Sequence, residues 1–217
     1  SAKSSSLPDL RKYPSGTPRK KAFLRTVMPY ITSQNAAITA ERNWLISKQY
    51  QGQWSPAERA RLKDIAKRYK VKWSGNTRKI PWNTLLERVD IIPTSMVATM
   101  AAAESGWGTS KLARNNNNLF GMKCMKGRCT NAPGKVKGYS QFSSVKESVS
   151  AYVTNLNTHP AYSSFRKSRA QLRKADQEVT ATAMIHKLKG YSTKGKSYNN
   201  YLFAMYQDNQ RLIAAHM

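Results

Sequence analysis

Residues 93–110 decide the fold, and they read Pro-Thr-Ser-Met-Val-Ala-Thr-Met-Ala-Ala-Ala-Glu-Ser-Gly-Trp-Gly-Thr-Ser. The apolar residues of this stretch, some of them small, are Met96, Val97, Met100, Ala101 and Ala103. Their spacing of three to four residues is typical of a helix with an apolar face. The pattern predicts a buried helix that ends near residues 104–106.

Glu104 is the only charged residue between Ile91 and Ser110. A lone carboxylate on such a segment is expected to be partly desolvated, and desolvation raises the pKa of a carboxyl group. A general acid that protonates a glycosidic oxygen at neutral pH needs a raised pKa. From composition alone, the alternative role is a helix cap or a partner for a nearby Arg or Lys.

Two segments around Glu104 resemble a known family. Residues 101–110 resemble the active-site helix of the bacterial endo-β-N-acetylglucosaminidases, glycoside hydrolase family 73, in which small residues precede Glu-Ser-Gly-Trp-Gly-x-Ser. Residues 117–123, Asn-Asn-Leu-Phe-Gly-Met-Lys, resemble the family's Asn-Asn-Leu-Phe-Gly-x-Lys segment, which leads into a β-lobe.

A third segment completes the resemblance. Gly190-Tyr191-Ser192-Thr193, followed by Tyr198 and Leu202, is similar to the family's Gly-Tyr-Ala-Thr and Tyr-x-x-x-Leu, with one residue more between the tyrosines. The motifs occur in family order within residues 90–215. The whole chain, with its basic N-terminal helical region, looks like the Bax-type members of Gram-negative bacteria.

The resemblance implies a mostly helical, lysozyme-like α+β fold with a small β-hairpin lobe. It implies hydrolysis of the β-1,4 bond between N-acetylglucosamine and N-acetylmuramic acid in peptidoglycan, with Glu104 as general acid and Tyr198 as a catalytic tyrosine. The matching positions expected to bind substrate are Ser105, Trp107, Asn118, Phe120 and Tyr191. The two large apolar ones, Trp107 and Phe120, are as well suited to the core. No cofactor and no metal are expected.

The chain departs from the family because it lacks a second acidic residue at the expected position. Most glycoside hydrolases use two carboxylates, and many members of this family carry the second on the β-lobe. Residues 105–146 contain no Asp or Glu, and residues 129–132, where that acid is expected, read Cys-Thr-Asn-Ala. Glu147 is expected to complete a capping box with Ser144 instead.

Several mechanisms follow from a single carboxylate. The N-acetyl group of the substrate can act as nucleophile, or Thr130, Asn131 or Tyr198 can orient a water. The same fold also supports a lytic transglycosylase, whose chemistry can run with one catalytic Glu. The non-enzymatic alternative is a basic protein that binds glycan without cleaving it.

The charge balance points to an anionic partner. The chain has 37 Lys and Arg against 11 Asp and Glu, a formal net charge of +26, and such a field attracts nucleic acid, anionic lipid or peptidoglycan. The sequence has no zinc-finger spacing, no RRM-type aromatic motif and no clear helix-turn-helix signature. Peptidoglycan is therefore the expected partner and nucleic acid is not, and a monomer is expected.

Cysteine use and hydropathy bear on the compartment. Cys124 and Cys129 are separated by four residues, so they either form a small local disulfide or remain free thiols. A metal site lacks further ligands, because the three histidines show no ligand spacing. No stretch approaches the ~20 apolar residues of a membrane span. We expect the periplasm or cell envelope, after removal of a signal peptide or anchor.

Local patterns divide the chain into three parts. Residues 1–19 are expected to form a flexible basic tail, residues 20–89 a helical region packed on the catalytic domain, and residues 90–217 that domain, with its β-lobe near 119–142. The helices predicted from periodicity and capping signals are 20–48 with a kink or break at Pro29, 55–70, 81–89, 144–156, 163–175, 178–189 and 198–214.

Overall fold

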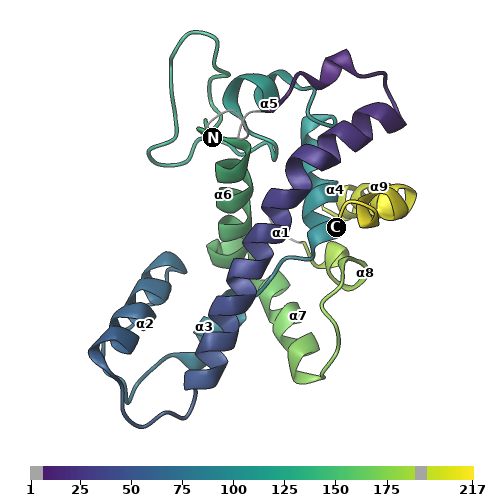
Figure 1. Ribbon diagram of the computed structural model, residues 1–217. Helices are drawn as coiled ribbons and strands as arrows, with labels where there is room; N and C mark the ends of the chain where they lie inside the picture. Colours follow the sequence, from purple (N-terminus) through teal and green to yellow (C-terminus); the bar gives the residue numbers. More distant parts are fainter. Residues whose placement is uncertain (1–6, 189–194) are drawn as a thin grey trace.

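A computed structural model describes residues 7–188 and 195–217 of the chain. The described part is mostly helical, and α1 (Thr17–Lys48) runs along most of its length (Figure 1). Helices α4 (Thr94–Ser105) and α6 (Val145–Thr158) pack against α1, and α9 (Lys196–Ala214) packs against α4. The remaining elements are η2 (Leu10–Lys12), α2 (Pro56–Arg68), α3 (Trp82–Arg88), α5 (Lys111–Asn116), η3 (Pro160–Tyr162), α7 (Ser163–Lys174), α8 (Ala181–Met184) and η4 (Ile185–Lys187).

Helix α1 confirms the predicted N-terminal helix and runs through Pro29 without the expected break. Its apolar stripe, which includes Phe23, Leu24 and Val27, is fully buried. These residues belong to one continuous core that also contains the apolar residues of α4, α6 and α9. The N-terminal helical region therefore shares its core with the segment that carries the family motifs.

Residues 7–19 are not the flexible tail that their composition predicts. Leu10 in η2 is completely buried, and the Arg19 guanidinium donates a hydrogen bond to its carbonyl oxygen at 3.1 Å. Helix α1 begins at Thr17, with a proline in its first turn. Leu10, with the partly buried Leu7, thus anchors a segment that is otherwise polar, and two leucines are too few to create a periodicity that a sequence pattern could reveal.

Helix α4 confirms the central prediction. It is surrounded by other helices, and its residues from Met96 to Ala102 are all buried. The helix stops at Gly106, whose backbone adopts the left-handed conformation with φ +55°, a C-terminal arrangement for which glycine is best suited. The end of α4 is therefore fixed one residue after Ser105.

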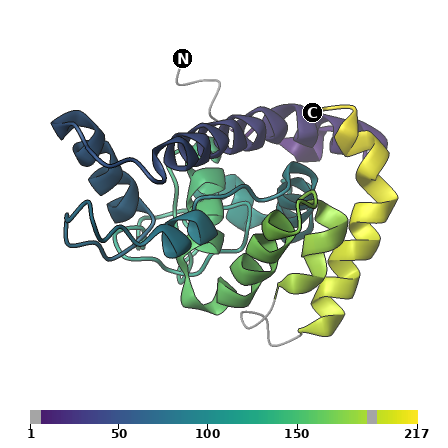
Figure 2. The ribbon, with the colours of Figure 1, turned by 90° about the horizontal axis from the view of Figure 1, so that it is seen from below.

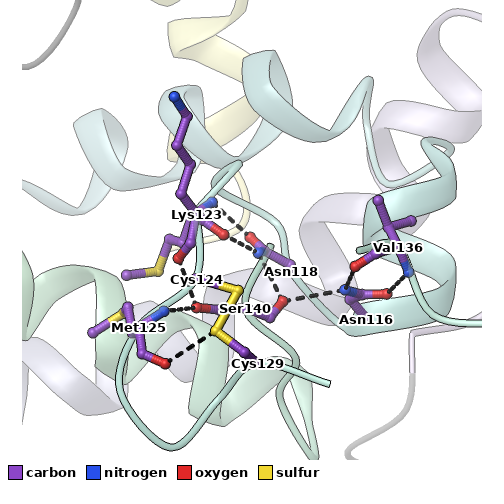
Figure 3. Close-up of a disulfide and its surroundings, with 9 residues drawn as sticks. Asn116, Asn118, Lys123, Cys124, Met125, Cys129, Val136 and Ser140 are labelled. Atoms are coloured by element: carbon purple, nitrogen blue, oxygen red, sulfur yellow. Dashed lines mark hydrogen bonds between the residues drawn. A yellow bond between two sulfur atoms is a disulfide. The ribbon is translucent and has the colours of Figure 1, made fainter. Parts of the chain in front are cut away.

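The segment expected to form a β-hairpin lobe contains no β-strands. Within the described part of the chain, residues 119–142 form loops joined by one antiparallel bridge between Lys123 and Tyr139. The side chains of Asn116 and Asn118 donate to the Ser140 carbonyl at 3.3 and 3.0 Å (Figure 3). Asparagine side chains thus replace part of the backbone ladder that a hairpin would provide.

The two predicted capping boxes differ. Ser55 and Glu58 cap α2 reciprocally, as predicted. Ser144 caps α6 by accepting from the Glu147 amide at 3.0 Å, but the Glu147 carboxylate accepts from the Ser143 amide instead and pairs with Arg128. In the second box, therefore, only the predicted cap by Ser144 is present.

None of the helices in the described ranges is long and apolar enough to cross a bilayer.

Candidate active site

A cavity of about 330 Å³ lies between α4, α6, α9 and the loop after α5. Its lining mixes apolar and polar side chains from segments far apart in the sequence. The lining residues are Met100, Glu104, Phe120, Gly121, Met122, Lys123, Cys124, Met125, Tyr152, Asn155, Tyr162, Leu188, Gly195, Tyr198 and Asn199. Among them, Glu104 is the only carboxylate.

Glu104 lies in the last turn of α4 and is exposed. This position contradicts the expected desolvation, because the helix is buried along its length but ends at Gly106, where it reaches the cavity mouth. The Tyr198 hydroxyl donates a hydrogen bond to Glu104 Oε1 at 2.5 Å. The structure thus brings together the two residues that the resemblance singles out as catalytic.

Gly121 leaves room for the other carboxylate oxygen. A Cβ atom built on this glycine would lie 3.2 Å from Glu104 Oε2, and the backbone has φ +66°. Both the close approach and the left-handed conformation favour glycine here. With Oε1 held by Tyr198, Oε2 is the oxygen that remains for a substrate.

Tyr198 is held in its protonated form. Burial raises the pKa of its hydroxyl well above the ordinary value, and the negative charge of Glu104 raises the pKa further. A neutral tyrosine donates one hydrogen bond through its hydroxyl. Tyr198 therefore acts on Glu104 as a fixed donor throughout the neutral range.

An aromatic pair forms one wall of the cavity. Phe120 and Tyr152 stack with ring centroids 4.2 Å apart and an interplanar angle of 4°. Burial raises the pKa of Tyr152 well above its ordinary value, so this phenol also stays neutral. Phe120, predicted as a substrate or core residue, is almost fully buried and also lines the cavity.

Ser105 and Trp107 do not line the cavity. The Ser105 hydroxyl is buried, donates to the Ala101 carbonyl at 2.6 Å and accepts from the Gly108 amide at 2.9 Å, so it fastens the turn after α4. Trp107 packs edge-on against Phe23 of α1, with ring centroids 5.5 Å apart. Ser105 thus fixes the turn that follows Glu104, and Trp107 joins this turn to α1.

Asn118 has a structural role as well. Its buried amide donates to the Met122 and Ser140 carbonyls at 2.8 and 3.0 Å, and its Oδ1 accepts from the Met122 amide at 3.0 Å (Figure 3). These bonds fix the loop that carries Phe120 and Gly121. Asn118 positions the cavity wall without lining the cavity.

The predicted disulfide between Cys124 and Cys129 is confirmed (Figure 3). The Cα atoms of the two residues are 5.2 Å apart. Cys124 lines the cavity, so the bond closes a short loop directly beside it. Tyr191 and the rest of the segment 190–193 lie outside the described residues.

Sequence reasoning missed Asn155. Its side chain reaches the cavity from α6 and has no hydrogen bond to residues 7–188 or 195–217. The signal that could have found it is its spacing of three residues from Tyr152, which places both side chains on one helix face.

Thr130 and Asn131, predicted to orient a water, do not line the cavity. No group of three or more His, Cys, Asp or Glu residues suited to a metal occurs in the described ranges.

A family model matches residues 81–211, more than half of the chain, and it is described as Glucosaminidase, mannosyl-glycoprotein endo-beta-N-acetylglucosaminidase. The chain belongs to this family. It is therefore a glycoside hydrolase. The matched range contains every residue that lines the cavity, and it excludes α1 and α2. A search of solved structures found no match.

Proposed function

We propose that the protein cleaves the β-1,4 bond between N-acetylglucosamine and N-acetylmuramic acid in peptidoglycan, with Glu104 as the general acid. The observation that carries the proposal is the Glu104–Tyr198 pair in a cavity that lies within the family match. The net charge of +26 favours peptidoglycan, whose stem peptides carry carboxylates, over neutral glycans. The periplasm or cell envelope is the compartment that contains this substrate.

Residues 90–217 serve in this proposal as the family's lysozyme-like catalytic domain, with the loops of 119–142 in place of the β-lobe. Glu104 Oε2 delivers the proton to the glycosidic oxygen as the bond to the sugar breaks. Tyr198 holds Oε1 through its hydrogen bond and so fixes the direction in which the carboxyl group points. An oriented acid of this kind contributes typically ~10²–10⁴-fold to the rate.

The single carboxylate favours a substrate-assisted route. The carbonyl oxygen of the N-acetyl group attacks the anomeric carbon from the face opposite the leaving oxygen, and a cyclic oxazolinium ion forms. Glu104, now deprotonated, then takes a proton from the water that opens this ring. Asn155, which has no partner among the described residues, can hydrogen-bond the N-acetyl group through its side-chain amide.

This route predicts retention of configuration at the new anomeric centre, because two displacements occur at one carbon. Proton NMR of a defined glycan, recorded during the first minutes of cleavage, distinguishes the two anomers before they equilibrate. We expect the β-anomer to appear first. An α-anomer as the first product would exclude the substrate-assisted route and favour a water oriented by Tyr198 or Asn155.

The proposed bond specificity predicts the ends of the products. Mass spectrometry of digested sacculi should find reducing N-acetylglucosamine ends. Anhydro-muramic ends would instead identify a lytic transglycosylase, the alternative that a single catalytic Glu also allows. Intact sacculi, together with cleavage of a mannosyl-glycoprotein glycan, would contradict peptidoglycan as the substrate.

A further inference from the structure

A segment outside the family match lies at the end of the molecule opposite α9. Helix α2 and the loop after it, residues 56–79, lie beside the C-terminal part of α1 (Figures 1 and 2). We call this segment the basic lobe. Leu62 and Ile65 join it to the common core, and the Arg61 guanidinium lies over the Trp44 ring of α1, 4.4 Å from the ring centroid.

The loop of the basic lobe folds back on its helix. The Arg59 guanidinium donates to the Gly75 carbonyl at 3.0 Å. Arg88 of α3 donates to the carbonyls of Tyr69 and Lys70 at 3.0 and 2.8 Å. The cations of the helix and of the loop are therefore held in one compact unit.

The few carboxylates of this region are already paired. Glu58 pairs with Lys48 at 2.5 Å, and Asp64 pairs with Arg68 at 2.9 Å. Glu41 of α1 pairs with the same Arg68. Apart from Arg61, which lies over the Trp44 ring, six further cations are exposed, and their side chains have no hydrogen bond or ion pair with any described residue: Lys63, Lys67, Lys70, Lys72, Arg78 and Lys79.

The arrangement of these cations is unfavourable for the isolated protein. Lys63 and Lys67 lie one turn apart on α2, and like charges at this spacing destabilise a helix. The apolar face of α2, with Leu62 and Ile65, is buried, so the charged face is turned to solvent. A bound polyanion would relieve the repulsion.

Helix α1 separates the basic lobe from the cavity. Phe23 contacts Trp107 in the turn after α4, and Trp44 contacts Arg61 of the lobe. At ~1.5 Å per residue Phe23 and Trp44 are about 30 Å apart along α1. The lobe therefore lies far from the turn that follows Glu104, where it can reach another part of an extended polymer.

We propose that the basic lobe is a second docking surface, which binds the stem-peptide carboxylates of peptidoglycan while the cavity engages the glycan. This inference takes its substrate from the proposed function. Two weak contacts on one polymer raise the effective concentration of each site for the other. The lobe thus keeps the enzyme on the wall between cleavage events.

The test is co-sedimentation with purified sacculi on ice, which measures binding separately from cleavage. The variant Lys63→Gln/Lys67→Gln/Lys72→Gln removes three unpaired cations of the lobe. The matched control, Lys21→Gln/Lys111→Gln/Lys146→Gln, removes three exposed lysines from α1, α5 and α6. We expect binding about tenfold weaker for the lobe variant, with a shallower dependence on salt, and a much smaller change for the control.

Sacculi with amidated carboxyl groups test whether carboxylates are the ligand. The parent protein should bind these amidated sacculi no better than the lobe variant does. Equal losses for the two triple variants would show a general charge effect and overturn the proposal. A loss of binding to duplex DNA or to anionic lipid vesicles, with unchanged binding to sacculi, would overturn it too. This experiment measures binding and not cleavage. Its result therefore tests the basic lobe even if the protein proves to cleave a different glycosidic bond.

Discussion

Glu104→Gln is expected to abolish clearing in a peptidoglycan zymogram and to lower the rate of sacculus digestion by ~10²–10⁴-fold. Glutamine keeps the size of the side chain but cannot supply the proton. The fold should be unaffected, because Glu104 is exposed and, among the described residues, its side chain hydrogen-bonds only Tyr198. Circular dichroism and the melting temperature should therefore match those of the parent protein.

Two further variants test whether the loss of activity is specific to the carboxyl group of Glu104. Glu178→Gln removes an exposed carboxylate outside the cavity and should leave the rate unchanged. Tyr198→Phe removes the donor to Glu104 and should give an intermediate loss, because the acid remains but is no longer oriented. Clearing by Glu104→Gln at the parent's rate would show that Glu104 is not the acid.

The largest effect on stability is expected at Asp90, which is buried before α4. Arg173 of α7 donates two hydrogen bonds to its carboxylate at 2.9 and 2.7 Å. Arg42 of α1 and the fully buried Arg169 of α7 lie 3.5 and 3.9 Å from it. One carboxylate thus joins α1 and α7 to the segment that leads into the catalytic helix.

Asp90→Asn is expected to lower the free energy of unfolding by about 3–5 kcal/mol, because it leaves the fully buried Arg169 and the largely buried Arg42 without their counter-charge. Urea denaturation followed by circular dichroism measures the change. The matched control is Asp64→Asn, which removes an exposed partner of Arg68 and should cost about 1 kcal/mol or less. Equal effects of the two substitutions would show that the Asp90 cluster adds nothing beyond a surface ion pair.

The same cluster sets a pH dependence. Burial raises the pKa of Asp90, but the Arg173 hydrogen bonds and the charges of Arg169 and Arg42 outweigh it, so the pKa lies below its ordinary value. A carboxylate with a lowered pKa stabilises the fold above its unfolded-state pKa of about 3.9, and this contribution is lost as the pH falls through the folded-state pKa. The difference between the parent and Asp90→Asn should therefore shrink in acid.

The sequence predicted the long helices well because their apolar residues recur at helical spacing, as in α1 and α4. It singled out Glu104 and Tyr198 through family motifs, but it did not predict their hydrogen bond, since no local pattern relates two residues so far apart in the chain. Motifs alone could not tell a residue that faces the cavity from one that builds its frame. Ser105 and Asn118 both belong to the family motifs, yet their side chains bond to backbone.

Other features of the site could not be predicted from the sequence, because they depend on how the helices pack together. The exposure of Glu104 depends on where α4 ends relative to its neighbours, which is a tertiary property. The family resemblance implied a β-hairpin lobe for residues 119–142, but in this chain the side chains of Asn116 and Ser140 satisfy backbone groups in another way. The spacing of Asn155 from Tyr152 places both on one face of α6, but the cavity that this face lines depends on the packing of α4, α6 and α9, which no local pattern shows.

The packing of α1 against α4 and α6 has a consequence for how this protein can be divided. The family match begins at residue 81, whereas the core that supports the catalytic turn includes Leu10 and Phe23. A Cβ atom on Gly108 would lie 2.3 Å from the Leu10 side chain, which shows how closely the first residues enclose that turn. The recognisable module is thus smaller than the folding unit, and a polypeptide trimmed to the module would expose the apolar flanks of α4 and α6 to water.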